Sequence, residues 1–599
     1  MSHGGGDHLN APRWLWWQIF VFGVLTIVCG AIGVSQYDQE HFPGEPHGLS
    51  PLYHAFQMLI MHTAHFDQGV NLWIEIGRWS GVLTVFSATA ALFGRRFLRE
   101  CRLLHLTCWS GHHVICGLGQ KGFALAMLRQ EQDSSARIVI LDPAPEEHLL
   151  EECERRGICV IVADASQARK LRQARIAYAS EVIVITNEDG INLRIAAAIR
   201  QQLGASPQSE PLCHVHLSDI HLREALERGI GPGGAPAAMQ LHFFDVFDSE
   251  ARRVLNAKPY LDGTGIRSDD PRSVHVVILG FGRMGRSLAL QAARLGHFAN
   301  GRPLRISVID RDAHQQRERL LFRHPIFAGE KLCALTFHSA EAESLTARNL
   351  IRAWADEAHA LLHLFICLDD DARGLEVALR LRALLRGRPG SSIRVRIHSR
   401  TSLAPILDAI QPPAPEDHPA PVEINHFGMV EDAWSEGAFV HDLRDQLARQ
   451  LHQEFVNERL AGSRRLPEND EALFPWEDLR YDFRQSNRHQ ADHIAIKLRA
   501  IGCELAETFD ARPAVEHLSP AEIAMLAPVE HQRWNAERWL AGWVYGTPSN
   551  KALRINENLV SWAELDPSIR LYDEQAVERI PAVLKRAMPD WKIVRITGP

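Results

Sequence analysis

A glycine turn that occurs twice, each time directly after a run of apolar residues, constrains this chain more than any other feature of its sequence. Both turns have the spacing G-x-G-x-x-G, at Gly117, Gly119 and Gly122 and again at Gly280, Gly282 and Gly285. The first glycine of such a turn permits a tight bend, the second lets the backbone approach a pyrophosphate, and the third lets a helix pack on a strand. The repeat, at a spacing of 163 residues, therefore predicts two Rossmann-type α/β domains.

Each turn is followed by a second apolar strand that ends in an acidic residue. In the first copy this residue is Asp142, and in the second copy it is Asp310. An acid about 20 residues after the turn is placed to accept hydrogen bonds from ribose hydroxyls. We therefore expect a nucleotide at these turns. The alternative for either copy is a Rossmann fold that has lost its ligand.

Further strands extend the pattern. Residues 157–164 predict a third strand, residues 181–186 a later one, and residues 213–219 a sixth. A His-Phe pair follows each copy, at 242–243 and at 426–427. The two pairs indicate that the repeat includes the tail beyond the sheet.

The first copy resembles the RCK family, the nucleotide- or ion-sensing Rossmann domains that regulate potassium channels and Trk-type uptake systems. The likeness covers about 110 residues and includes the glycine turn, Asp142, the Ala-Asp164-Ala step and residues 186–189. It implies that Asp164 joins Asp142 at the ligand. It also implies that the ligand is a nucleotide, either NAD(H), ATP or an AMP-like molecule.

Two apolar segments near the N-terminus predict membrane spans, although the mean hydropathy of the 599-residue chain is −0.16. Residues 14–34 carry no charge and are long enough for a hydrocarbon core of ~30 Å. Residues 72–93 form the second segment, and arginines follow it within residues 95–102. By the positive-inside rule both termini are cytoplasmic, and we expect a bacterial inner-membrane location. The net charge of −8 leaves no basic excess for binding nucleic acid.

A shorter apolar segment between the spans, residues 51–61, has the length of a re-entrant helix. Its sequence resembles the pore helix of potassium channels, in which a Thr-Val-Gly-Tyr-Gly filter follows and coordinates the ion through backbone carbonyls. Here the pore residues that follow are His62, Thr63, Ala64, His65 and Asp67. Because the glycines are missing, we expect a pore that conducts monovalent cations with less selectivity than the family. A membrane anchor with an amphipathic external helix is the alternative.

Tryptophan is concentrated near the C-terminus, where four tryptophans fall between Trp534 and Trp562. His531, Trp534 and Arg538 have the spacing i, i+3 and i+7, which places them on one helix face. Gly542 is a natural end for that helix, with Trp543 and Tyr545 on the turn beyond it. An imidazole, an indole and a guanidinium on one face could stack a base and bind a phosphate.

This region resembles the RyR domain, first named from ryanodine receptors and also found in bacterial proteins. The likeness covers about 110 residues and includes the upstream residues Arg484, Asn487 and Arg488. It implies a nucleotide-derived messenger as ligand, either ADP-ribose-like or a cyclic nucleotide. The alternative is that the aromatic residues form the core of a small helical domain.

These features predict a multidomain chain. Its expected parts are a cytoplasmic tail (1–13), a pore segment (14–94), a linker (95–110), a first RCK domain (111–271), a second RCK domain (272–435), a helical connector (436–474) and a mostly α-helical RyR domain (475–599). A two-span pore with tandem RCK domains is the arrangement of ligand-gated potassium-channel relatives, so the resemblance implies a homotetramer.

We expect a ligand-gated cation channel, with a stress or antiviral effector role inferred from its combination of domains. A non-conducting, membrane-anchored nucleotide sensor is the alternative. We expect no enzyme activity, because the sequence contains no H-E-x-x-H, G-x-S-x-G or Walker lysine motif. A redox or NAD-consuming enzyme is the rival class. The ten cysteines form no C-x-x-C pair, so we expect no metal site.

Overall fold

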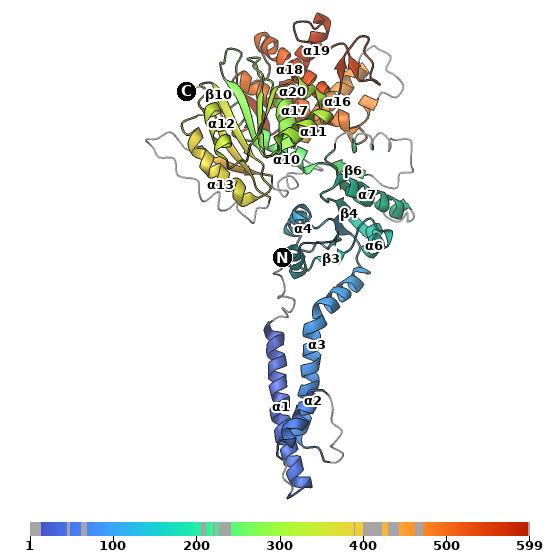
Figure 1. Cartoon of the computed structure of the whole chain (residues 1–599). Coiled ribbons are helices and arrows are strands. Elements are labelled where there is room, and N and C mark those ends of the chain that lie inside the picture. The colour runs from blue at the N-terminus through green and yellow to red at the C-terminus, as the bar shows by residue number, and fades with distance from the viewer. Residues whose placement is uncertain are drawn as a thin grey trace. The chain divides into compact units, whose positions relative to one another are not determined.

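The computed structural model, shown in Figure 1, divides into two compact units, one of residues 1–110 with 173–175 and one of residues 111–172 with 176–599. The residues that it describes are 13–44, 48–60, 69–204, 211–219, 222–223, 226, 241–388, 390–398, 422–428, 443–461 and 471–596.

Three helices form the first unit, namely α1 (Arg13–His41), α2 (Ser50–Leu59) and α3 (Leu72–Leu106). They overlap the three predicted apolar segments, residues 14–34, 51–61 and 72–93. α1 continues beyond residue 34 because its next residues are compatible with a helix, and it ends just before Pro43. α3 continues through most of the predicted linker, since residues 95–106 contain neither glycine nor proline. Within the described residues, Trp16–His41 is the one helical stretch long and apolar enough to cross a membrane.

Small residues let these helices approach backbone to backbone. A Cβ on Gly33 would lie 2.6 Å from the backbone nitrogen of Ile74, and one on Gly81 would lie 2.6 Å from the carbonyl oxygen of Met58. The Thr26 hydroxyl hydrogen-bonds the Ser80 hydroxyl at 3.0 Å between α1 and α3. Close contacts between small residues, together with buried polar bonds, are typical of helix packing in membranes.

Two parallel sheets of six strands form the centre of the second unit. The first sheet contains β1 (His112–Cys116), β2 (Ile138–Asp142), β3 (Cys159–Val162), β4 (Ala179–Val184), β5 (Leu212–His216) and β6 (Leu241–Phe244). The second contains β7 (Ser273–Leu279), β8 (Arg305–Asp310), β9 (Ala334–Ser339), β10 (Ala360–Ile366), β11 (Ser392–Arg396) and β12 (Ile424–Phe427). Their orders are β3-β2-β1-β4-β5-β6 and β9-β8-β7-β10-β11-β12. This shared order is that of the doubly wound Rossmann fold, so the predicted duplication of the fold is confirmed.

Helices connect the strands of both sheets. In the first repeat they are α4 (Gln120–Gln132), α5 (Glu147–Arg155), α6 (Ala168–Gln173) and α7 (Asp189–Gly204). In the second repeat they are α10 (Arg283–Leu295), α11 (Ala313–Arg323), α12 (Leu345–Ala355) and α13 (Asp371–Arg382).

One strand prediction was wrong. Residues 213–219 were expected to supply a sixth strand, but they form the fifth, β5, because the chain between β3 and β4 folds as a helix and a short helical turn rather than as another strand. The sixth strand is β6, which contains His242-Phe243, and β12 contains His426-Phe427. The repeated His-Phe pair therefore marks the last strand of each sheet.

Helix α9 (Val246–Leu255) follows β6 and packs against α10 of the second repeat. Its N-terminus is capped by Asp245, whose carboxylate accepts a hydrogen bond from the Phe247 N–H at 2.9 Å. Val254 and Ala251 of α9 belong to the same apolar core as residues of α10. The last helix of the predicted first domain is thus buried against the second domain.

The C-terminal part is mostly helical. Its helices are α16 (Leu443–Ala461), α17 (Tyr481–Ala500), α18 (Pro520–Leu540), α19 (Pro567–Glu578) and α20 (Ile580–Ala587). The strands β13 (Cys503–Glu507) and β16 (Trp591–Arg595) pair antiparallel, and β14 (Val544–Tyr545) pairs with β15 (Ile555–Asn556). We call residues 471–596 the C-terminal module.

The glycine turns allow a test of the fold. A Cβ on Gly122 would lie 1.9 Å from the Gly117 carbonyl oxygen, whereas one on Gly119 would have no described atom within 4 Å. We expect Gly122→Ala to lower the free energy of unfolding by about 1–3 kcal/mol, because helix α4 must move away from β1. Gly119→Ala should stay within about 0.5 kcal/mol of the native chain. Urea unfolding of the two variants measures the difference, and equal effects would contradict the close packing.

Candidate functional site

The first glycine turn lies at the switch point of the first sheet, where neighbouring connections run to opposite sides. Gly117 follows β1 with a φ of +117°, a conformation that favours glycine. A Cβ there would lie 3.0 Å from the carbonyl oxygen of Ile185, beyond the end of the adjacent strand β4. α4 begins at Gln120 with Gly119 as its N-cap residue. Backbone N–H groups at the start of a helix are suited to bind a phosphate.

Asp142 is directed at this turn. One of its carboxylate oxygens accepts a hydrogen bond from the Leu118 N–H at 2.7 Å, and the other accepts one from the Ala144 N–H at 2.8 Å. The same arrangement recurs at the second turn. There Asp310 accepts from the Phe281 N–H at 2.6 Å and from the Asp312 N–H at 2.8 Å. Each carboxylate keeps further lone pairs that can accept from ribose hydroxyls, so both sites fit a nucleoside.

Asp164 lies elsewhere. It is exposed beyond the end of β3, and its carboxylate accepts a hydrogen bond from the Ser166 N–H at 2.8 Å. That backbone bond holds the pKa of Asp164 below its usual value. The structure therefore brings Asp142 to the glycine turn and places Asp164 one strand further along the sheet.

A row of four rings and two guanidinium groups lies on the C-terminal module. The guanidinium of Arg538 is 5.7 Å from the ring centre of Trp534 and 5.3 Å from that of Trp543. The column continues from Trp534 through His531 to Trp562, with ring centres 5.8 and 5.9 Å apart, and ends at Arg570, 5.4 Å from the Trp562 ring. We call these six residues the aromatic column.

Arg538 gives the aromatic column its binding potential. Its Nε is buried and makes no hydrogen bond within the part of the chain that the structure describes. Trp534, Arg538 and Trp543 are half-buried. A guanidinium between two partly accessible indoles can bind an anion while the rings stack on a base. Tyr545 lies near the column in sequence, but it is 60% exposed and belongs to β14 rather than to a turn.

His531 is committed to holding the module together. It is 2% exposed, its Nε2 lies 2.9 Å from the Val560 carbonyl oxygen, and its Nδ1 lies 3.1 Å from a carboxylate oxygen of Asp573. With both ring nitrogens occupied, His531 orients Trp534 and Trp562 rather than facing a ligand. The sequence missed Arg570 and Asp573 as partners because both lie on α19, at no helical spacing from α18.

Two of the three predicted residues of α17 contact residues outside the aromatic column. Asn487 donates a hydrogen bond to the Phe483 carbonyl oxygen, one turn back on the same helix, at 2.9 Å. Arg488 is held by Asp445 of α16, with its Nε 2.7 Å from the carboxylate, and its guanidinium lies 5.7 Å from the Trp476 ring. Arg484 is half-buried in the first turn of α17.

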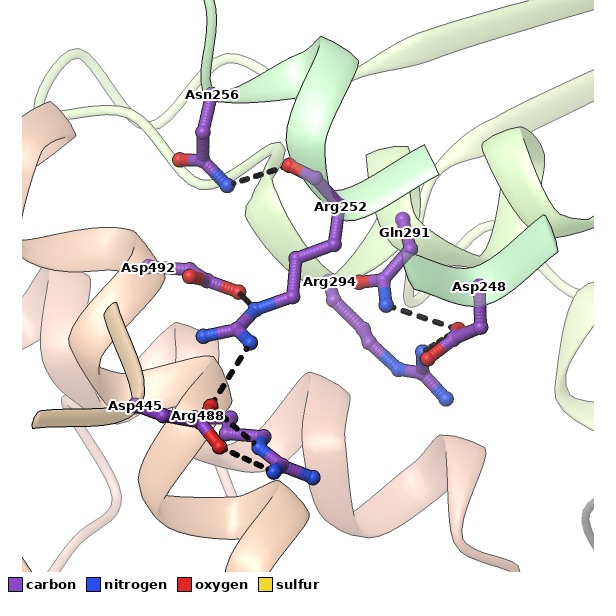
Figure 2. Close-up of polar contacts among 8 residues, drawn as sticks. All are labelled: Asp248, Arg252, Asn256, Gln291, Arg294, Asp445, Arg488 and Asp492. Carbon is purple, nitrogen blue, oxygen red and sulfur yellow. Dashed lines mark hydrogen bonds and ion pairs between the residues drawn. The ribbon is translucent and has the colours of Figure 1, made fainter. Parts of the chain in front are cut away.

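Figure 2 shows that Asp445 belongs to a larger network of charges. Arg252 of α9 donates to Asp492 of α17 at 2.5 Å and pairs with Asp445 at 3.3 Å. Asp445 in turn binds Arg488. The residues alternate in charge, which is the condition for stable ion pairs away from water. The network joins α9, α16 and α17.

A second buried pair lies between the segment after α9 and the end of α17. The Asp262 carboxylate accepts hydrogen bonds from Arg499 at 2.8 to 3.0 Å, and both side chains are buried. The backbones also approach here, since a Cβ on Gly265 would lie 2.3 Å from the Arg499 carbonyl oxygen. The C-terminal module is thus fixed to the Rossmann part by charge pairs and by close packing.

The predicted pore residues, His62, Thr63, Ala64, His65 and Asp67, lie outside the described residues, so the pore prediction is untested at its filter. No group of three or more metal-ligating side chains occurs among the residues that the structure describes.

Comparison with known proteins assigns part of the chain. Residues 113–221 match the TrkA-N domain family, a stretch that includes the first glycine turn, Asp142 and Asp164. The structure of GsuK bound to ADP is similar at 15% identity and a TM-score of 0.36, covering 70% of this chain and 96% of that one. The human SLO3 gating ring is similar at 11% identity and a TM-score of 0.34, covering 55% and 82%.

A third similar structure is the NAD(P)-binding domain of an exopolyphosphatase-related protein from Archaeoglobus fulgidus. It is 18% identical with a TM-score of 0.20 and covers 25% of this chain and 96% of that one. No curated protein matches the chain.

The Asp262–Arg499 pair predicts a large stability effect. We expect Arg499→Gln to destabilise the chain by on the order of 3–5 kcal/mol, because Asp262 would remain buried without its partner. Urea unfolding followed by tryptophan fluorescence measures it. Arg155→Gln is the matched control, since Arg155 pairs with Glu152 on the exposed face of α5 and should cause no measurable change. Equal effects would show that the buried pair is no more important than a surface pair.

Buried histidines on α17 predict a pH effect. Burial lowers the pKa of His489 and of His493 well below 6.5. In the unfolded chain they take up protons below about pH 6.5, whereas in the folded chain they stay neutral, so stability is present above that pH and is lost as pH falls. We expect the free energy of unfolding to fall below about pH 6.5, by on the order of 1 kcal/mol per pH unit for each histidine.

Urea unfolding at several pH values measures this slope. His489→Gln should reduce it, whereas the same change at the exposed His148 should not. An unchanged slope in His489→Gln would contradict the prediction.

Proposed function

We propose that this chain is a subunit of a membrane channel for monovalent cations, gated by a nucleotide that binds to its Rossmann domains. The observation that carries the proposal is the first glycine turn, which lies inside the stretch matching the TrkA-N family and to which Asp142 is hydrogen-bonded. Gly119 supports it as well, since no described atom would meet a Cβ at this position and a pyrophosphate can approach the backbone.

The C-terminal module supplies a second candidate sensor site. Arg538 between Trp534 and Trp543 offers a cation between two rings, which suits an ADP-ribose-like molecule or a cyclic nucleotide. The RyR assignment of this module rests on the sequence resemblance. In this proposal the network of Arg252, Asp445 and Asp492 links the module to the Rossmann part.

Helices α1, α2 and α3 would form the pore segment in a homotetramer in the bacterial inner membrane. The support is the apolar length of α1, the two interhelical polar contacts from Thr26 and Asn71, and the short α2 between the longer helices. Five residues separate the end of α3 from β1. A ligand that binds one conformation of the tetramer about 100-fold more tightly than the other would supply about 2.7 kcal/mol per site for gating.

The test is a current recording from the full chain in planar bilayers with K⁺ and Na⁺. We expect at least one nucleotide among ATP, AMP, NAD(H), ADP-ribose and cyclic oligonucleotides to change the current. Gly119→Trp should abolish the response if the first Rossmann domain binds the nucleotide, because an indole would fill the approach to the turn. Arg538→Ala should abolish it if the aromatic column binds the nucleotide.

Gly329→Trp is the matched control and should leave the response intact, because Gly329 is exposed, equally open and outside both glycine turns. Nucleotide binding without any current would overturn the channel and favour the non-conducting sensor. Turnover of the nucleotide would favour an enzyme instead.

A further inference from the structure

Three cationic side chains from the two repeats lie near the first glycine turn, and two of them lie beside Phe247. Lys121 belongs to that turn, and its Nζ lies 4.8 Å from the centre of the Phe247 ring. Arg396 is the last residue of β11 in the second repeat, and its guanidinium lies 5.7 Å from the centre of the same ring. Burial, together with the charges of Arg283 and Arg396, lowers the pKa of Lys121 to about 8. The second repeat therefore places positive charge beside the first turn.

Lys121 has no counter-ion among the residues described. Its Nζ is shielded from solvent and makes neither a hydrogen bond nor an ion pair with any of them. A buried ammonium without a hydrogen-bond acceptor is costly, and like charges beside it add to the cost. The positive charge at the end of the Lys121 side chain is therefore not neutralised by an ion pair with any described residue.

Two carboxylates act on Lys121 from a distance and are engaged elsewhere, whereas Asp369 pairs with Arg396 at 3.3 Å. Asp245 accepts the Phe247 N–H at 2.9 Å and lies 3.6 Å from Nε2 of the buried His216. Asp189 accepts hydrogen bonds from the backbone N–H groups of Ser218 and Asp219, at 3.1 and 3.0 Å. Both carboxylates moderate the charge of Lys121, yet neither comes within ion-pair distance of it.

Arg283 reaches the first repeat directly. It is the residue after Gly282 in the second glycine turn, and its guanidinium donates a hydrogen bond to the carbonyl oxygen of Asn187. Asn187 follows β4, the strand next to β1 at the switch point of the first sheet. A residue of the second turn thus borders the crevice in which the first turn would bind its ligand.

We propose that Lys121, Arg283 and Arg396 form one anion site shared by the two repeats, which binds the phosphate chain of a nucleoside diphosphate or a larger nucleotide at the first glycine turn. The identity of the anion as a nucleotide rests on the proposed function, whereas the anion site itself rests on the three cations. The helix N-terminus of α4 binds one part of the phosphate chain, and the three side chains bind the part that projects toward the second repeat.

The test is isothermal titration calorimetry of the full chain in detergent with ADP, adenosine and inorganic pyrophosphate. We expect Arg283→Gln to weaken ADP and pyrophosphate binding by roughly tenfold or more and to leave adenosine binding unchanged, because a charge-assisted contact to phosphate is lost. Arg311→Gln is the matched control. Arg311 follows Asp310 at the second turn and is 74% exposed, so its removal should change nothing.

The outcomes separate the two proposals. Pyrophosphate binding that depends on Arg283, without ADP binding, would support the anion site and overturn its assignment to a nucleotide. Equal ADP affinity of the native chain and Arg283→Gln would overturn the shared site while leaving the nucleotide proposal intact. Binding of neither probe by the native chain would overturn both. Thermal unfolding of Arg283→Gln, compared with the native chain, verifies that a loss of affinity is not a loss of fold.

Discussion

The buried charge pairs between the Rossmann part and α17 determine how the second unit is built. Asp262 and Arg499 are both almost fully enclosed, as are Asp492 and the Arg252 stem that reaches it. Charges without water are tolerated when each is paired and hydrogen-bonded, so either side of this contact would be unfavourable alone. The C-terminal module and the second Rossmann repeat are consequently parts of one folded body, and the apolar core that α9 shares with α10 adds to the same contact.

The duplicated Rossmann fold was predictable from the sequence because its signals are local. Gly117 and Gly122 are required by a turn in which the third glycine touches the carbonyl of the first, and the acid of the second strand has a fixed role at that turn. The buried strands are continuous apolar runs, as parallel sheets covered on both faces require. The first helix of the first unit was predictable as well, since residues 14–34 are an uncharged apolar run of helical length.

The contacts between distant segments were not predictable in the same way. Arg488 was expected at a ligand, but its partner Asp445 lies on another helix, 43 residues away in sequence. His531 shares a helix face with Trp534 and Arg538 as predicted, yet its neighbours from α19 and Val560 bury it. The strand count failed for a related reason, because the chain between β3 and β4 folds as a helix and a helical turn rather than as another strand. The spacing of residues within one helix or strand shows which side chains share a face. Only the tertiary structure shows which other elements cover that face.

Helix α9 is short, but it connects two distant parts of the second unit. At 1.5 Å per residue its ten residues extend about 15 Å. Its first turn holds Phe247, against which Lys121 of the first glycine turn lies, and its last turn holds Arg252, which is paired with α17. A helix of three turns is stiff over this distance, so it acts as a rod between the first glycine turn and α17. A rotation of the rod displaces both ends together, so a movement at the glycine turn is passed to α17.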